Sequence, residues 1–142
     1  MKKTLLFCLF LSISFPIFAQ QSDAIVGEWF NQEKTATILV YKKSGLYFGK
    51  INTSPESGKT KPANDEKNPD KALQTKPIVG LEILKNFVFT KEKIWDEGTI
   101  YDPNNGKTYS SFIKMVDYNT LDIRGYVGIS LLGRTTQWTR KP

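Results

Sequence analysis

Histidine is absent from this sequence of 142 residues, and cysteine occurs only once, as Cys8. Without histidine, Ser-His and Cys-His nucleophile pairs cannot form, and zinc sites built on imidazole ligands are excluded. A single cysteine allows no intramolecular disulfide, so burial of apolar surface must hold the fold together. The side chains that remain for catalysis are carboxylates, lysines, tyrosines and hydroxyls. We therefore expect a non-catalytic protein that carries no metal and no cofactor.

Long apolar runs are also scarce, and the one at the N-terminus is typical of a secretory signal peptide. Lys2 and Lys3 supply the positive start, residues 5–15 the apolar stretch, and residues 17–19 a small-residue cleavage site. A membrane-spanning helix needs roughly 20 apolar residues, and this stretch is shorter. We expect cleavage of residues 1–19, a periplasmic or secreted location, and no membrane span in residues 20–142.

The formal net charge is +6, and many of the lysines fall in one loop-like stretch. Lysines between residues 59 and 76 are mixed there with Asp65, Glu66 and Asp70. This mixture is typical of a solvated loop, so we expect no nucleic-acid partner. The loop, residues 52–77, is long for a compact domain, which indicates a functional loop or a partly ordered flap. Asn68 and Pro69 would suit the cap and first position of a short helical turn within it.

Short segments with alternating apolar residues make up most of the rest of the chain. Ser44-Gly45 and the Asp-Pro-Asn-Asn-Gly sequence at 102–106 are turn signals, and Gly49 indicates a bulge or a close backbone approach. The pattern predicts an all-β fold: one domain, residues 20–142, forming a small closed antiparallel up-and-down barrel of about eight strands. The segments expected to be extended are residues 24–31, 35–42, 46–51, 77–84, 87–90, 98–101, 107–116, 121–127 and 135–140. An outer-membrane barrel is disfavoured because no continuous apolar outer band is present.

Several of these segments carry motifs of one exported bacterial family. The motifs are Ile-Val-Gly-Leu-Glu-Ile-Leu at 78–84, Gly-Thr-Ile-Tyr-Asp-Pro at 98–103, Gly-Lys-Thr-Tyr at 106–109, Leu-Asp-Ile-Arg-Gly-Tyr-Val-Gly at 121–128 and Leu-Gly-Arg-Thr-Thr-Gln-Trp-Thr-Arg at 132–140. With them the chain resembles the family called domain of unknown function 2147. The resemblance implies a lipocalin-like (calycin) barrel and an exported protein, and it implies no activity. Many members carry a cysteine pair in the long loop, and this chain has none there.

Gly27-Glu28-Trp29 is similar to the Gly-x-Trp motif that opens lipocalin barrels. In those barrels the tryptophan closes the floor and a late arginine packs across its ring. Arg140 or Arg134 could take that position here, with the planar guanidinium stacked on the indole of Trp29. Trp29 and Arg140 are the pair that we expect to close the barrel.

The candidate ligand-binding residues are aromatic side chains and one arginine: Trp29, Tyr47, Tyr109, Arg124, Tyr126 and Trp138. Arg124 would anchor a carboxylate or phosphate if its side of the strand faces inward. The outward orientation is favoured, because Leu121 and Ile123 make the better core face. Aromatic residues at such positions are also more often core packing than ligand contacts.

Three functions remain open. The leading hypothesis is a monomeric barrel that binds a small, lipid-like ligand, apolar or amphipathic. The alternative is a structural or interaction module of the cell envelope, with a packed barrel and partner-binding loops. An enzyme comes third, since the carboxylates of Asp96, Glu97 and Asp122 show no spacing that brings two of them to one cleft. A cavity larger than roughly 300 Å³ would favour the first hypothesis over the second.

Overall fold

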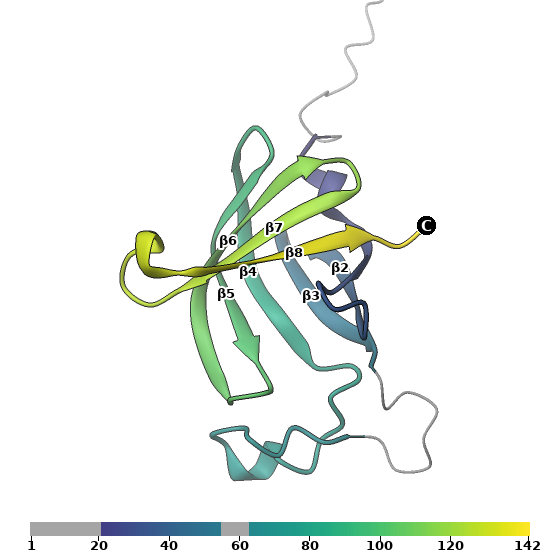
Figure 1. Cartoon of the computed structure of the whole chain (residues 1–142), viewed down its shortest axis with the longest axis vertical. Helices are drawn as coiled ribbons and strands as arrows, with labels where there is room; N and C mark the ends of the chain where they lie inside the picture. The colour runs from purple at the N-terminus through teal and green to yellow at the C-terminus, as the bar shows by residue number, and fades with distance from the viewer. Residues whose placement is uncertain (1–20, 55–62) are drawn as a thin grey trace, which may run out of the picture.

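Eight antiparallel strands, each hydrogen-bonded to the next along the chain, close into a barrel in the computed structural model, which describes residues 21–54 and 63–142 (Figure 1). The strands are β1 (Gly27–Phe30), β2 (Thr37–Lys43), β3 (Leu46–Thr53), β4 (Glu82–Lys91), β5 (Ile94–Asp102), β6 (Lys107–Asp117), β7 (Thr120–Tyr126) and β8 (Arg134–Arg140). The short 3-10 helices are η1 (Asp23–Ile25), η2 (Lys71–Leu73) and η3 (Ser130–Leu132). The predicted closed up-and-down barrel is confirmed. The expected signal peptide, residues 1–19, and part of the expected long loop, residues 55–62, lie outside the described residues.

Pairing of the last strand with the first closes the sheet. Trp29 and Phe30 of β1 lie opposite Arg140 and Thr139 of β8. At the predicted turn between β2 and β3, Ser44 and Gly45 both have positive φ angles, 52° and 78°, which suit a two-residue hairpin turn. The predicted irregularity at Gly49 is confirmed as well, since the register of β3 against β4 shifts there.

Three of the strands predicted in the middle of the chain have wrong boundaries. Residues 77–81 form a turn in which Leu81 donates to the carbonyl of Ile78, so β4 begins only at Glu82. Residues 87–90, expected as a separate strand, continue β4, because the positive φ of Asn86 is absorbed as an irregularity and does not end the strand. β5 begins at Ile94, earlier than expected, for the same reason: the positive φ of Glu97 lies at a register shift and the strand continues through it.

Smaller corrections concern the two short helical turns. The first strand begins at Gly27, because residues 23–25 form η1. The turn expected near residue 68 exists as η2, but its cap is Asp70, whose side chain accepts a hydrogen bond from the Ala72 amide.

The described residues include no helix that is long and apolar enough to cross a bilayer.

η1 closes one end of the barrel, called here the closed end. Ile25 is fully buried, and three aromatic side chains that point into the barrel donate to the segment around it. Trp29 Nε1 donates to the Ile25 carbonyl at 2.9 Å, Trp95 Nε1 to the Ser22 carbonyl at 3.0 Å, and the Tyr47 hydroxyl to Asp23 Oδ1 at 2.6 Å. The indole and phenol groups thus satisfy their polar atoms on η1 while their rings fill the core.

Arg140 lies at the centre of the closed end. Its guanidinium is stacked between the rings of Trp29 and Tyr118, 4.1 Å from each ring centroid. It donates to the carbonyl oxygens of Tyr118, Val26 and Ala24 at 2.8, 3.2 and 2.7 Å. Gly27 leaves room for this group, since a Cβ there would lie 2.9 Å from an Arg140 nitrogen. The structure therefore places Arg140, and not Arg134, on Trp29.

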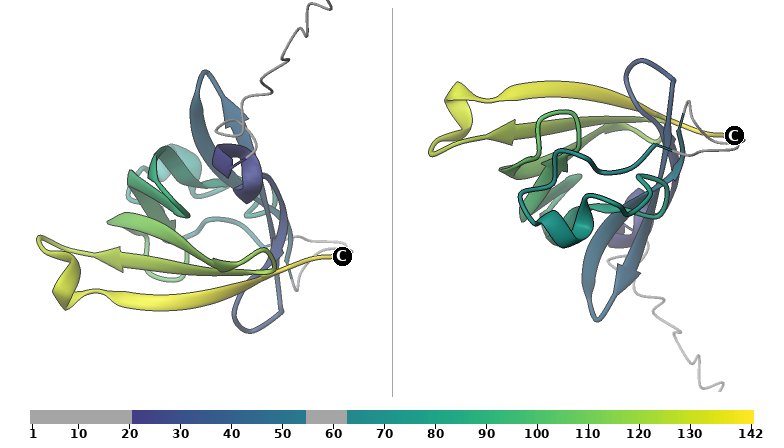
Figure 2. Two further views of the ribbon diagram at one scale, coloured as in Figure 1. Left: turned by 90° about the horizontal axis from the view of Figure 1, so that it is seen from above. Right: turned by 90° about the horizontal axis from the view of Figure 1, so that it is seen from below.

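The opposite end, called the mouth, is formed by the loops β1–β2, β3–β4, β5–β6 and β7–β8 (Figures 1 and 2). Between the two ends the interior is divided. Near η1 it is filled by large buried side chains, including Phe87, Trp95, Met115 and Leu121. Toward the mouth the interior is lined by isoleucines together with tyrosines and Trp138, and these side chains leave space between them. The sequence thus makes one half of the barrel solid and leaves the other half hollow.

The closed end yields a first prediction. Arg140→Lys keeps the charge but loses the planar stack on two rings and the fixed fork of donors to three carbonyls. We expect it to lower the free energy of unfolding by about 2–4 kcal/mol, measured by urea denaturation with tryptophan fluorescence. Lys114→Ala on the exposed side of β6 is the control, and an equal loss in both variants would contradict the role given to Arg140.

Candidate binding cavity at the barrel mouth

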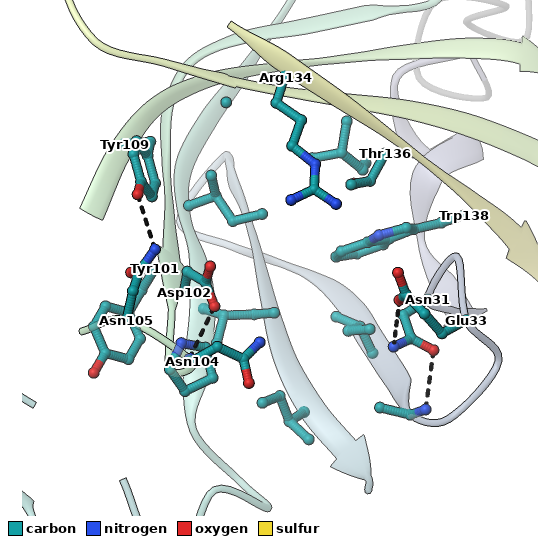
Figure 3. A pocket seen from close by; sticks show the side chains of 18 of the residues that line it. Asn31, Glu33, Tyr101, Asp102, Asn104, Asn105, Tyr109, Arg134, Thr136 and Trp138 are labelled. Atoms are coloured by element: carbon teal, nitrogen blue, oxygen red, sulfur yellow. Dashed lines mark hydrogen bonds between the residues drawn. The ribbon is translucent and has the colours of Figure 1, made fainter. Parts of the chain in front are cut away.

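A cavity of about 680 Å³ occupies the mouth half of the barrel (Figure 3). It is lined by side chains from most strands and from all four mouth loops. The apolar and aromatic lining residues are Ala36, Ile38, Ile51, Ala63, Ile78, Ile83, Ile100, Tyr101, Tyr109, Ile123, Tyr126, Val127, Leu132 and Trp138. The polar side chains of the lining include Asn31, Glu33, Thr35, Asp102, Asn104, Asn105, Arg134 and Thr136.

The floor of the cavity is apolar and buried. Ile38, Ile123 and Trp138 lie there, each less than 5% exposed. They come from β2, β7 and β8 and face inward because successive strand residues alternate between the two faces of the sheet. A ligand that reaches this depth meets only hydrocarbon and the indole ring.

Polar groups are concentrated around the entrance, where most of them stabilise turns. Asn31 Oδ1 accepts hydrogen bonds from the amides of Thr35 and Ala36 at 2.8 and 3.0 Å. Asp102 Oδ1 accepts from the Asn104 amide at 2.9 Å, as the turn chemistry of 102–106 predicts. These side chains shape the entrance, and the bonds within the turns already occupy these two oxygen atoms.

Arg134 differs from the other polar lining residues. It starts β8, and its guanidinium reaches into the cavity on the side of Thr136 and Trp138 (Figure 3). No residue in the described part of the chain forms a hydrogen bond or ion pair with it. A guanidinium offers five donors in a planar fork that fits carboxylates and phosphates. The cavity thus combines an apolar floor with one cation at its side.

The ordered part of the long loop is held against the barrel by a buried carboxylate. Asp65 is 1% exposed and accepts hydrogen bonds from the Tyr101 hydroxyl and from Asn68 Nδ2, both at 2.7 Å. Its amide donates to the Lys76 carbonyl at 2.9 Å. Burial, and then the bond to Asp65, raise the pKa of Tyr101 to about 12. Asp65, expected to belong to a solvated loop, is instead the residue that docks this loop.

A second contact joins the loop to the β5–β6 turn. Gly106 has a φ of +72°, and a Cβ at this position would overlap the carbonyl oxygen of Lys67. Lys67 Nζ also donates to the Asn104 carbonyl at 2.7 Å. Glycine is therefore required at position 106 both by the turn and by the packing of the loop on it.

The six candidate ligand-binding residues separate into three groups. Tyr109, Tyr126 and Trp138 line the cavity. Trp29 and Tyr47 belong to the closed end and do not line it. Arg124 lies on the outer face of β7, as the favoured interpretation held, because Leu121 and Ile123 take the inward positions.

The arginine that does face the cavity was missed by the sequence reasoning. Arg134 was considered there only as a partner for Trp29. The signal was present, since positions 134, 136 and 138 alternate along one strand and Trp138 is a core residue.

The carboxylates considered for catalysis, those of Asp96, Glu97 and Asp122, do not line the cavity. Among the described residues no group of three or more acidic, histidine or cysteine side chains could hold a metal ion.

The contact at Gly106 gives a second prediction. Gly106→Ala should detach residues 64–78 from the β5–β6 turn, because the new methyl group overlaps the Lys67 carbonyl. Hydrogen exchange of the amides of Asp65 and Ile78, which donate within this loop, is then expected to accelerate at least about tenfold. Gly45→Ala is the matched control, with a similar φ of +78° and no atom within 4 Å of its Cβ. Equal acceleration in both variants would show that backbone strain alone is responsible.

The raised pKa of Tyr101 gives a third prediction, which concerns alkaline pH. Between the ordinary tyrosine value of 10.0 and about 12, the unfolded chain loses the Tyr101 proton while the folded chain keeps it. The free energy of unfolding should therefore fall across this range, and it should fall less steeply in Tyr101→Phe. Urea denaturation at several pH values measures the slopes. An unchanged slope in Tyr101→Phe would contradict the buried bond.

Comparison with known proteins agrees with this architecture. Residues 27–140 match the family described as "Uncharacterized protein conserved in bacteria (DUF2147)". A solved structure of similar fold is protein HP1028 from Helicobacter pylori, described as belonging to the lipocalin family, with a TM-score of 0.73, 20% sequence identity and 82% of each chain covered. At this identity the likeness concerns the fold alone. A search of curated proteins finds no significant match.

Proposed function

The chain belongs to the DUF2147 family of uncharacterised bacterial proteins, and from its cavity we propose that it is a non-catalytic binding protein for a small amphipathic molecule. The ligand class is an acyl or comparably apolar chain with an anionic head group. In this proposal the apolar floor of the cavity holds the alkyl part of the ligand, and Arg134 binds its head group.

The size and lining of the cavity carry this proposal. A volume of about 680 Å³ lies within the roughly 300–1,000 Å³ typical of small-molecule sites. The volume also exceeds roughly 300 Å³, the value above which the binding hypothesis is favoured over a packed interaction module. Ile38, Ile123 and Trp138 would bury the apolar part of the ligand, and apolar burial is the main source of affinity in such sites.

Arg134 supports the assignment of an anionic head group. Its guanidinium has no partner among the described residues, whereas Glu33 and Asp102, the two carboxylates of the lining, already accept hydrogen bonds from Asn31 Nδ2 at 3.3 Å and from the Asn104 amide at 2.9 Å. A charged hydrogen bond to a carboxylate would occupy donors that are otherwise free. We propose Arg134 for the role that the sequence had suggested for Arg124.

Export is part of the same proposal. It is supported by the charged start, the apolar stretch and the small-residue site within residues 1–19. A protein of this kind would carry its ligand in the periplasm or outside the cell, as a monomer.

Blocking the cavity tests the proposal and is the fourth prediction. Thr136 lines the cavity, and its neighbour Gln137 points outward and is exposed. Thr136→Trp should abolish binding of dodecanoate, measured by isothermal titration calorimetry, because the indole fills the space between Arg134 and Trp138. Gln137→Trp, which adds the same ring on the outer face, should bind like the parent. Equal affinity in the two variants would overturn the proposal.

A second arm of this titration tests the head group. Arg134→Gln should weaken dodecanoate binding about tenfold, the value of one charged hydrogen bond, and should leave dodecanol binding unchanged. A similar loss for both ligands would mean that Arg134 shapes the cavity and does not recognise charge.

A further inference from the structure

The loop between β7 and β8 exposes an unusual concentration of apolar side chains. Residues 127–132, called here the apolar tip, include Val127, Ile129, Leu131 and Leu132, which are 72%, 59%, 81% and 76% exposed. In the described part of the chain no other exposed large apolar side chains are grouped so closely. The β7–β8 hairpin projects beyond the body of the barrel, with the tip at its far end (Figures 1 and 2).

Three carbonyls and one amide of the tip backbone form hydrogen bonds within the protein. Arg124 Nε and Nη2 donate to the carbonyls of Ser130 and Leu131 at 2.6 and 3.2 Å. The amides of Leu132 and Gly133 donate to the carbonyls of Ile129 and Ser130, both at 3.2 Å. An exposed loop in water does not need these bonds. A loop that enters an apolar medium does, because unsatisfied backbone groups are costly there.

The position of the tip connects it to the cavity. Val127 and Leu132 belong to the tip and also line the cavity, and Arg134 follows two residues after Leu132. An apolar surface would therefore continue from the tip into the barrel. The tip lies at the end of a projecting hairpin (Figures 1 and 2), and residues 20–142 carry a formal net charge of +4, which favours an anionic surface. These features fit insertion between lipid head groups better than docking on a partner protein.

We propose that the apolar tip inserts Ile129 and Leu131 into the interfacial region of a lipid surface and so places the mouth of the barrel against it. With few inserted side chains the attachment is peripheral and reversible. This inference holds whether or not the cavity binds an amphipathic ligand.

The test, the fifth prediction, uses residues of the tip that do not line the cavity. Ile129→Ser combined with Leu131→Ser should reduce binding to phosphatidylcholine–phosphatidylglycerol vesicles at least about tenfold, because two apolar side chains lose their burial. Vesicle co-sedimentation of the protein gives the bound fraction. Val116→Ser, an exposed apolar residue near the closed end that is 45% exposed, should bind vesicles like the parent.

Further measurements distinguish a lipid surface from a second copy of the protein as the partner of the tip. Near-ultraviolet circular dichroism checks that the double variant folds; if it does not, Leu131→Asn alone replaces it. No binding by the parent, equal binding by parent and tip variant, or loss of all binding at high salt would each overturn the proposal. A parent that is dimeric by light scattering, and becomes monomeric on tip substitution, would show that a second copy covers the tip and would overturn it as well.

Discussion

The stack of Trp29, Arg140 and Tyr118 is the contact on which the closed barrel depends. Arg140 ends β8, Trp29 lies in β1, and Tyr118 lies in the β6–β7 turn. The guanidinium therefore joins the two strands that must meet if the sheet is to have no edge. Burial lowers the pKa of Arg140, while Tyr118 opposes this shift. Hydrogen bonds to three backbone carbonyls and contacts with two aromatic rings replace the water that the Arg140 guanidinium loses on burial.

Closure at one end determines what the other end can do. The bulky residues Phe87 and Trp95 fill the half of the interior next to η1, and they belong to the same hydrophobic core as the floor residues of the cavity. The mouth half can then remain hollow and be lined by isoleucines and Trp138. Its entrance is built from loops, among them the segment docked through Asp65 and the β7–β8 loop. The bulkiest core residues thus lie in one half of the barrel and the cavity in the other.

Much of the fold could be predicted from the sequence, because strand alternation and turn residues are local signals. The Ser44-Gly45 turn and the irregularity at Gly49 are of this kind. The strand boundaries next to Asn86 and Glu97 were predicted wrongly, since a strand that continues through a positive φ depends on its neighbouring strands and not on its own residues. The site was harder to predict. Trp138 and Tyr109 were found as aromatic residues, but the inward side chain of Arg134 depends on which face of β8 is buried.

A crystal structure of the protein with dodecanoate tests the central claim most directly, namely that the barrel is solid at one end and holds a ligand at the other. The account predicts the alkyl chain on the floor formed by Ile38, Ile123 and Trp138, with the carboxylate within hydrogen-bonding distance of Arg134, and an unchanged stack of Arg140 on Trp29. A cavity closed by inward movement of its isoleucines, or dodecanoate bound outside the barrel, would contradict it.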